Sequence, residues 1–303
     1  MTANTILADI NEIYCGYVLN GNKWYDMEAK RTYEMRLGQC KPEEAKDAQG
    51  KAEAMAAEFL KWAKENKYGT PIKNVWWTAR PGSMSSAFGE PVDQKKNPTD
   101  ILVQFTIGPS RGFLGLSAKA TKTKGDIGFK NPGVGTIDKS LSMKLAAKVK
   151  ERTEEVIEQY NLPSSAKERK AVIRQNYNIK MGTEKEGTKL LNELRNELRK
   201  KLLTMSDADL KQYLLSDWMD AEILAPPYIK VTGQGKKEPY TADVMDPTSN
   251  PKLAAMAKYP LKLSEVGNDS IGVMAGDKRI MKMRFKFESE KMASSMKMSG
   301  DPW

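Results

Sequence analysis

The sequence predicts an α/β or α+β protein with a mixed central sheet, flanking helices and a helical insertion. Three observations predict this class: a helical pattern near the N-terminus, three strand patterns in a row after residue 70, and a long helical region before strand patterns resume near residue 228. Elements in this order are typical of a sheet covered by helices. The 303 residues, 40% of them apolar, suffice for a buried core.

Helices are expected at the start of the chain. Over residues 5–20, apolar side chains recur at helical spacing, and Asn20-Gly21 supplies a stop signal. Two more helices are predicted over 24–37 and 42–67, the second with Pro42 in its first turn.

Three strands are predicted next. Residues 72–79 are short and rich in Val, Ile and Trp, and the tryptophans Trp76 and Trp77 are expected in the core, with base stacking as the alternative. Residues 101–107 alternate apolar side chains on one face, and 113–120 follow after turn residues. The second and third strands are expected to pair as a hairpin.

The second half of the chain divides into a helical and a strand region. Helices are expected over 141–222, with breaks at Leu162-Pro163 and Met181-Gly182. A strand is expected over 228–232, then a polar stretch over 233–252, then a hairpin of 271–275 and 279–287 around Gly276-Asp277. We therefore expect four segments: the N-terminal part of the core over 1–140, a helical insertion or subdomain over 141–222, C-terminal strands completing the sheet over 223–290, and a loose tail over 291–303.

Composition excludes several kinds of enzyme. The chain has no histidine, which removes Ser-His-Asp and Cys-His nucleophile systems and HExxH zinc hydrolases. Cys15 and Cys40 are too few for a disulfide framework or a structural zinc site. An enzyme here must therefore work with carboxylates, lysine, tyrosine, hydroxyl groups or a cofactor, and of these carboxylates plus lysine suit magnesium-dependent phosphodiester chemistry.

Positive charge is concentrated in one segment. The chain carries a formal charge of +10, and residues 111–150 hold nine basic residues against two acidic ones, a local excess of seven. A concentrated basic stretch is typical of a protein that binds a polyanion, and we favour nucleic acid here over the alternative of a solvated lysine-rich surface. The basic residues are Arg111, Lys119, Lys122, Lys124, Lys130, Lys139, Lys144, Lys148 and Lys150.

The apolar runs are shorter than a membrane span, and no charged-then-apolar leader opens the chain. We therefore expect no membrane association and a cytoplasmic location, which would be the host cytoplasm if a phage encodes the protein.

One group of residues could form a catalytic site. Asp100 opens the second predicted strand, and Ser117-Ala118-Lys119 closes the third. Ser117 and Lys119 are two residues apart, so they share a face of their strand, and a hairpin can bring that face beside Asp100. A carboxylate next to a lysine at a strand edge suits metal-assisted hydrolysis.

This arrangement resembles the PD-(D/E)XK nuclease superfamily, which includes restriction-endonuclease-like and Holliday-junction-resolvase-like proteins, some of them phage-encoded. The resemblance implies a restriction-endonuclease-like core and a magnesium-dependent DNA endonuclease, with Mn²⁺ as an alternative metal. Many members add a glutamate on the first helix, and Glu12 is the match. Along the helix surface Glu12 lies in line with Ala8, Cys15 and Leu19, which are small or apolar. This line is nearly opposite the main apolar stripe, so the helix must be covered on both sides. The implied catalytic residues are Glu12, Asp100, Ser117 and Lys119, and the implied metal ligands are Glu12, Asp100 and the carbonyl of Ala118.

The sequence departs from the family pattern at Ser117, where an acidic residue is usual. This departure leaves open a catalytically inactive relative that only binds nucleic acid, and Asp126 is a rival to Glu12 for the second carboxylate. The glycine- and lysine-rich loop over 121–136 is interpreted as gripping the substrate, expected to be double-stranded DNA. A homodimer and a structural, virion-type assembly protein remain open. The expected nucleic-acid contacts are Arg111, Lys122, Lys124, Lys130, Asn131 and Lys139.

Overall fold

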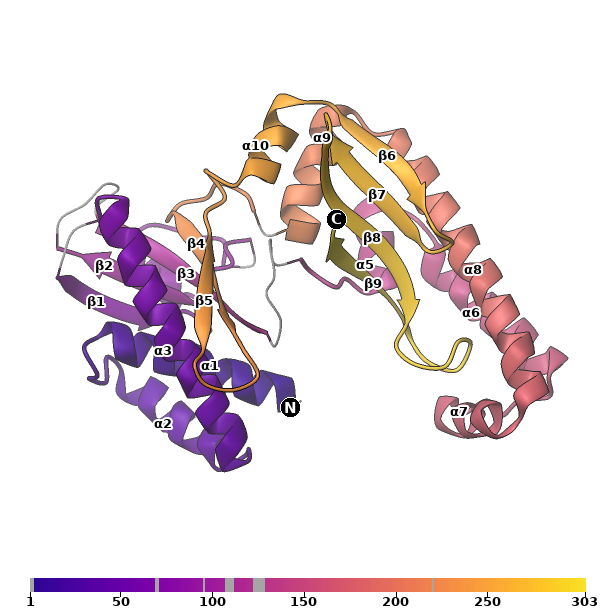
Figure 1. The fold of residues 1–303 in the computed structure, drawn as a ribbon, viewed down its shortest axis with the longest axis horizontal. Coiled ribbons are helices and arrows are strands. Elements are labelled where there is room, and N and C mark those ends of the chain that lie inside the picture. The colour runs from indigo at the N-terminus through magenta and orange to yellow at the C-terminus, as the bar shows by residue number, and fades with distance from the viewer. Residues whose placement is uncertain (1–2, 69–70, 95, 107–111, 122–128, 220) are drawn as a thin grey trace. The chain divides into compact units, whose positions relative to one another are not determined.

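A computed structural model describes residues 3–68, 71–94, 96–106, 112–121, 129–219 and 221–303. The chain folds as two compact units, each built from two separate stretches of sequence. Unit 1 comprises residues 1–128 and 220–250, and unit 2 comprises residues 129–219 and 251–303. Figure 1 colours the chain by residue number, so the orange strands β4 and β5 can be seen beside the magenta strands of unit 1.

Unit 1 contains a five-stranded mixed sheet and the helices packed on it, which confirms the predicted mixed class. The strands lie in the order β1-β2-β3-β4-β5; β3 and β4 are parallel and the other neighbours are antiparallel. The strands are β1 Ile72–Trp77, β2 Ile101–Phe105, β3 Phe113–Thr121, β4 Tyr228–Gln234 and β5 Thr241–Met245. The helices are α1 Ala3–Leu19, α2 Met27–Leu37, α3 Pro42–Glu65 and α4 Ser83–Phe88.

Helix α1 is buried on two sides, as its sequence predicted. Cys15 and Leu19 join the core between α3 and the sheet, together with strand residues such as Val103. Ile10 and Ile13 pack into a second cluster with residues of α2. Because α1 is held on both sides, a side chain on its remaining face is presented in a fixed orientation.

Unit 2 combines helices with a four-stranded antiparallel sheet in the order β6-β7-β8-β9. Helix α8 packs against β7 and β8 of this sheet. The helices are α5 Val134–Leu141, α6 Leu145–Gln159, α7 Ala166–Gln175, α8 Tyr177–Leu203, α9 Asp207–Tyr213, a π-helix Leu214–Met219 and α10 Pro251–Lys258. The strands are β6 Leu261–Val266, β7 Ser270–Ala275, β8 Lys278–Phe287 and β9 Met296–Pro302.

The structure divides the second half of the chain differently from the sequence expectation. Of the expected C-terminal strands only β4 joins the first sheet, where it pairs with β5, a strand that was not expected; the predicted hairpin is confirmed as β7 and β8, but it belongs to a second sheet. The expected loose tail instead contains β9, which pairs with β8 and buries Met296 and Met298. Strand β5 lies where a polar stretch was expected, and no element was predicted where helix α10 and strand β6 lie.

The predicted helix break at Met181-Gly182 is wrong, whereas the break at Leu162-Pro163 is confirmed between α6 and α7. Helix α8 runs through Gly182, where the glycine makes room for a neighbour: a Cβ there would lie 2.3 Å from the Tyr160 hydroxyl. Glycine here serves close packing rather than chain reversal.

Gly115 on β3 should tolerate no side chain. A Cβ would lie 2.0 Å from Thr99 Oγ1 and 2.9 Å from Tyr228 Cβ. We expect Gly115→Ala to lower the free energy of unfolding by about 1–3 kcal/mol through overpacking, measured by urea unfolding. Gly38→Ala is the matched control in unit 1, since the nearest atom to its Cβ is 3.5 Å away. Equal stability of the two variants would contradict the packing described here.

Candidate functional site

Asp100 is held at the junction of three strands. It immediately precedes β2; its backbone N–H donates to the Leu116 carbonyl (2.9 Å), and its carbonyl accepts from the Thr78 N–H (3.0 Å). The β2–β3 register pairs Ile101 with Leu116. Asp100 therefore lies beside the middle of β3, next to Leu116 and Ser117, as the predicted hairpin requires.

Three donors from β3 converge on one oxygen of the Asp100 carboxylate. Oδ2 accepts from the Ala118 backbone N–H (2.7 Å), from Lys119 Nζ (3.4 Å) and from Ser117 Oγ (3.5 Å). The Asp100 side chain keeps 24% of its surface exposed, so it can be reached from solvent. The carboxylate is thus oriented by the protein and still accessible to a ligand.

Glu12 reaches the same site from α1. Its Oε2 accepts a hydrogen bond of 3.0 Å from Trp77 Nε1, and Trp77 is the last residue of β1. Burial, followed by repulsion from Asp100, raises the pKa of Glu12 to about 8, against the opposing effects of the Trp77 hydrogen bond and Lys119. Glu12 and Asp100 are therefore near enough for each charge to oppose the other.

The charge at the site is incompletely balanced when both carboxylates are ionised. Burial raises the pKa of Asp100, and the nearby Lys119 together with the Ala118 N–H acts in the opposite direction. Two carboxylates then face one lysine ammonium group in a shielded setting. A bound cation would relieve the repulsion between them, because an opposite charge favours the ionised form of a carboxyl group.

The oxygen donors present fit a magnesium ion. Magnesium is commonly bound through one or two carboxylates with waters and phosphate oxygens, and Glu12 and Asp100 supply two. The N–H and C=O of a strand residue point to the same edge, and the Ala118 N–H faces Asp100, so its carbonyl faces this edge as well. Within the described ranges there is no group of three or more Asp, Glu, Cys or His side chains placed to hold a metal.

The predicted site residues fall into two groups. Glu12, Asp100, Ser117 and Lys119 are brought together in unit 1. Of the expected nucleic-acid contacts, Lys130, Asn131 and Lys139 belong to unit 2. Arg111, Lys122, Lys124 and the rival carboxylate Asp126 lie outside the described residues.

Several cations of the basic segment already have partners. Lys130 Nζ donates to the Ser216 carbonyl (2.8 Å), so this side chain ties two parts of unit 2 together. Lys148 forms ion pairs with Glu193 and Glu197 of α8. Asn131 and Lys139 are exposed. The local excess of positive charge over residues 111–150 is therefore partly neutralised by acidic residues that the fold brings from elsewhere in the chain.

Sequence reasoning missed two residues near the site. Trp77 was expected to be core and is buried, but it also donates to Glu12. Lys230 on β4 is 1% exposed and pairs in register with Ser117, so the two lie on the same face of the sheet. A lysine within the apolar run of β4 is the one signal that could have identified it.

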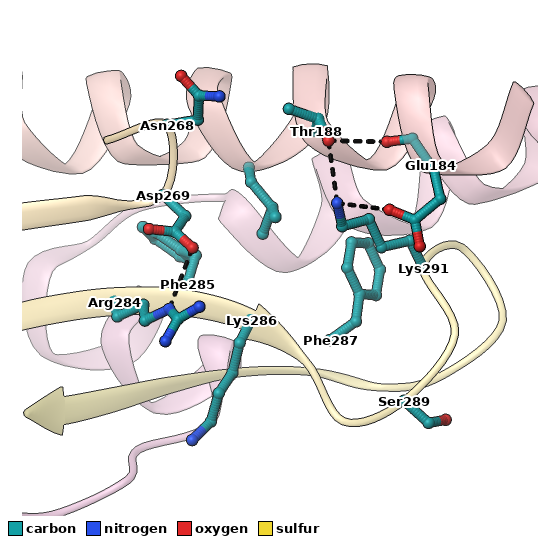
Figure 2. A pocket seen from close by; sticks show the side chains of 11 residues that line it. Glu184, Thr188, Asn268, Asp269, Arg284, Phe285, Lys286, Phe287, Ser289 and Lys291 are labelled. Atoms are coloured by element: carbon teal, nitrogen blue, oxygen red, sulfur yellow. Dashed lines mark hydrogen bonds and ion pairs between the residues drawn. The ribbon is translucent and has the colours of Figure 1, made fainter. Parts of the chain in front are cut away.

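Two pockets lie elsewhere. Unit 2 holds a cavity of about 370 Å³. Figure 2 shows its lining, in which residues of β8 and of the chain after it face α8. There Arg284 pairs with Asp269 (3.0 Å) and Lys291 with Glu184 (2.7 Å). A larger cavity in unit 1, of about 890 Å³, lies between the start of α3 and residues 236–240. Neither is lined by the catalytic candidates, so the carboxylate–lysine cluster remains the candidate site.

No protein-family model matches the sequence, and a search of curated proteins finds no match. Both cysteines are free thiols. Among the described helices, none combines the length and the apolar character that crossing a membrane requires.

Because of Glu12, the free energy of unfolding of the metal-free protein should fall as the pH rises. Its pKa is 4.5 for an unperturbed glutamate and about 8 in the fold. Between these values the folded chain retains a proton that the unfolded chain has lost, so the stabilisation present at low pH disappears as the pH passes the folded pKa. We expect the wild type to lose more stability than Glu12→Gln between about pH 5.5 and about pH 7.5, measured as urea midpoints in EDTA. Identical losses would contradict the shielded position of Glu12.

Proposed function

We propose that the protein is a magnesium-dependent DNA endonuclease of the PD-(D/E)XK type. The observation that carries this proposal is the convergence of Glu12 from α1, Asp100 from the start of β2 and Lys119 from the end of β3. A shielded pair of carboxylates with raised pKa values beside a lysine is a candidate functional site on physical grounds.

The chain's own groups have distinct roles in this proposal. Glu12, Asp100 and the Ala118 carbonyl would hold the metal, which when bound supplies Lewis-acid polarisation of a phosphate oxygen. Lys119 Nζ orients the attacking water and stabilises the negative charge that develops on the phosphate. The Ala118 N–H keeps Asp100 in place. The absence of histidine is compatible with this chemistry, because none of these steps needs an imidazole.

The arrangement of elements supports the same proposal. Helix α1, which carries Glu12, precedes the antiparallel strands β1, β2 and β3, with α2 and α3 before β1 and α4 between β1 and β2, and β4 returns parallel to β3. This order resembles the core of the superfamily. Ser117 stands where an acidic residue is usual, and it contributes a hydroxyl 3.5 Å from Asp100 instead of a third carboxylate. Manganese is the expected substitute for magnesium.

A nucleic-acid-binding protein without catalysis is the second candidate. Ser117 favours it, since loss of the usual acidic residue removes a metal ligand. One experiment separates the two candidates: the protein is incubated with plasmid, single-stranded DNA and RNA in magnesium, manganese or EDTA, and cleavage and binding are measured. Metal-dependent cleavage supports the nuclease, whereas salt-dependent binding without cleavage supports the second candidate.

Asp100→Ala should reduce metal-dependent plasmid cleavage at least about a hundredfold, because the metal and the oriented water lose their main anchor. DNA binding in EDTA should change little. Asp277→Ala, which alters an exposed turn residue of unit 2, is the control and should cleave normally. Full activity of Asp100→Ala would end the assignment.

Glu12→Gln should abolish cleavage in the same assay, whereas Asp126→Asn should leave it largely intact. Glutamine keeps the shape of the side chain and can still accept the Trp77 hydrogen bond, but it removes the charge needed to hold the metal. The reverse outcome would place the second metal ligand in the loop and leave Glu12 with a structural role.

Replacing Lys122 and Lys124 with alanine should weaken DNA binding and flatten its salt dependence by about one slope unit per lost phosphate contact. Lys139→Ala tests the exposed part of the segment in unit 2 separately. Lys130→Ala is not combined with these variants, because Lys130 Nζ also donates to the Ser216 carbonyl. A loss of DNA binding in that variant would not distinguish a lost phosphate contact from a change in structure. An unchanged salt slope in all variants would place the interface elsewhere.

A further inference from the structure

We propose that Trp77 is a positioning residue: its indole N–H holds one oxygen of Glu12 so that the other is presented to the cation. The inference rests on the proposed function and deepens it. It concerns a side chain that touches neither substrate nor metal and that acts through Glu12.

The end of β1 bonds to both residues that carry the carboxylates of the site, to the side chain of Glu12 and to the backbone of Asp100. Trp77 Nε1 donates to Glu12 Oε2 at 3.0 Å. The next residue, Thr78, donates its backbone N–H to the Asp100 carbonyl at 3.0 Å. Trp77 also pairs in register with Ile101, the residue after Asp100. Two consecutive residues of one strand end therefore set the position of Glu12 relative to Asp100.

The chemistry of indole suits this role. The Nε1–H group is a donor only, so it can bond to a carboxylate oxygen but cannot accept a proton from one. Trp77 is 8% exposed, so water is a poor substitute partner. Rotation of Glu12 away from the site would leave the indole N–H buried without a partner, which is unfavourable. Groups that bond to a metal ligand in this way orient it and tune its affinity for the metal.

The neighbouring tryptophan provides a matched control. Trp76 lies on the opposite face of β1, where its ring packs beside Phe113 with centroids 6.0 Å apart. Trp76→Phe and Trp77→Phe remove the same atoms from adjacent residues of one strand. Only the second removes the donor to Glu12.

The experiment measures Mn²⁺ binding to the whole protein without DNA, by calorimetry, alongside the Mg²⁺ dependence of cleavage. Trp77→Phe should weaken metal binding about tenfold to a hundredfold and raise the half-saturating metal concentration, while Trp76→Phe leaves both near the wild-type values. DNA binding in EDTA should be unchanged in both variants. In a Glu12→Gln background, Trp77→Phe should add no further loss of metal affinity, because the group it positions is gone.

A variant that changes only the donor covers the case in which Trp77→Phe does not fold. An isosteric residue at position 77 with sulfur in place of the indole N–H keeps the ring volume and should reproduce the loss of affinity. Wild-type metal affinity in that protein, or in folded Trp77→Phe, would overturn the inference and leave the proposed function standing. A wild type that binds no divalent cation and cleaves nothing would instead overturn the proposed function together with the inference.

Discussion

The repulsion between two shielded carboxylates is the interaction around which the candidate site is built. Glu12 and Asp100 oppose each other's ionisation in a setting where water screens them poorly. Each has a compensating donor: the Trp77 indole for Glu12 and the Ala118 N–H for Asp100, with Lys119 acting on both. Such an arrangement is unfavourable for folding alone, because neutral side chains of similar shape would avoid the repulsion. It becomes understandable if the site is completed by a cation.

The surrounding fold keeps this arrangement from relaxing. Helix α1 is packed on two sides, so it cannot turn Glu12 away. The β1–β2–β3 register holds Asp100 through its backbone, and the lack of a side chain at Gly115 lets Thr99, Tyr228 and β3 approach closely. Most of these contacts are backbone hydrogen bonds or apolar packing, which depend little on pH. The scaffold should thus persist while the ionisation of the site changes.

The two units contribute differently to the electrostatics. The carboxylate–lysine cluster belongs to unit 1, whereas much of the basic segment belongs to unit 2 and is partly neutralised by the acidic residues of α8. Charge counted along the sequence therefore overstates the positive surface there. This follows from chain geometry: residues far apart in sequence become neighbours, and a lysine beside a glutamate presents little net charge to a distant polyanion.

The sequence by itself determined the local features: the helices and strands with strong periodicity, Asp100 at a strand start, and Lys119 two residues after Ser117 on one strand face. These depend on residues close together in the chain. The tertiary structure decided which strands share a sheet: the β7–β8 hairpin, which was expected to complete the first sheet, pairs with β6 and β9 in a second one. It also decided that Trp77 bonds to Glu12, 65 residues away, and that Lys130 binds a carbonyl. Such contacts are set by non-local packing, which no local pattern encodes.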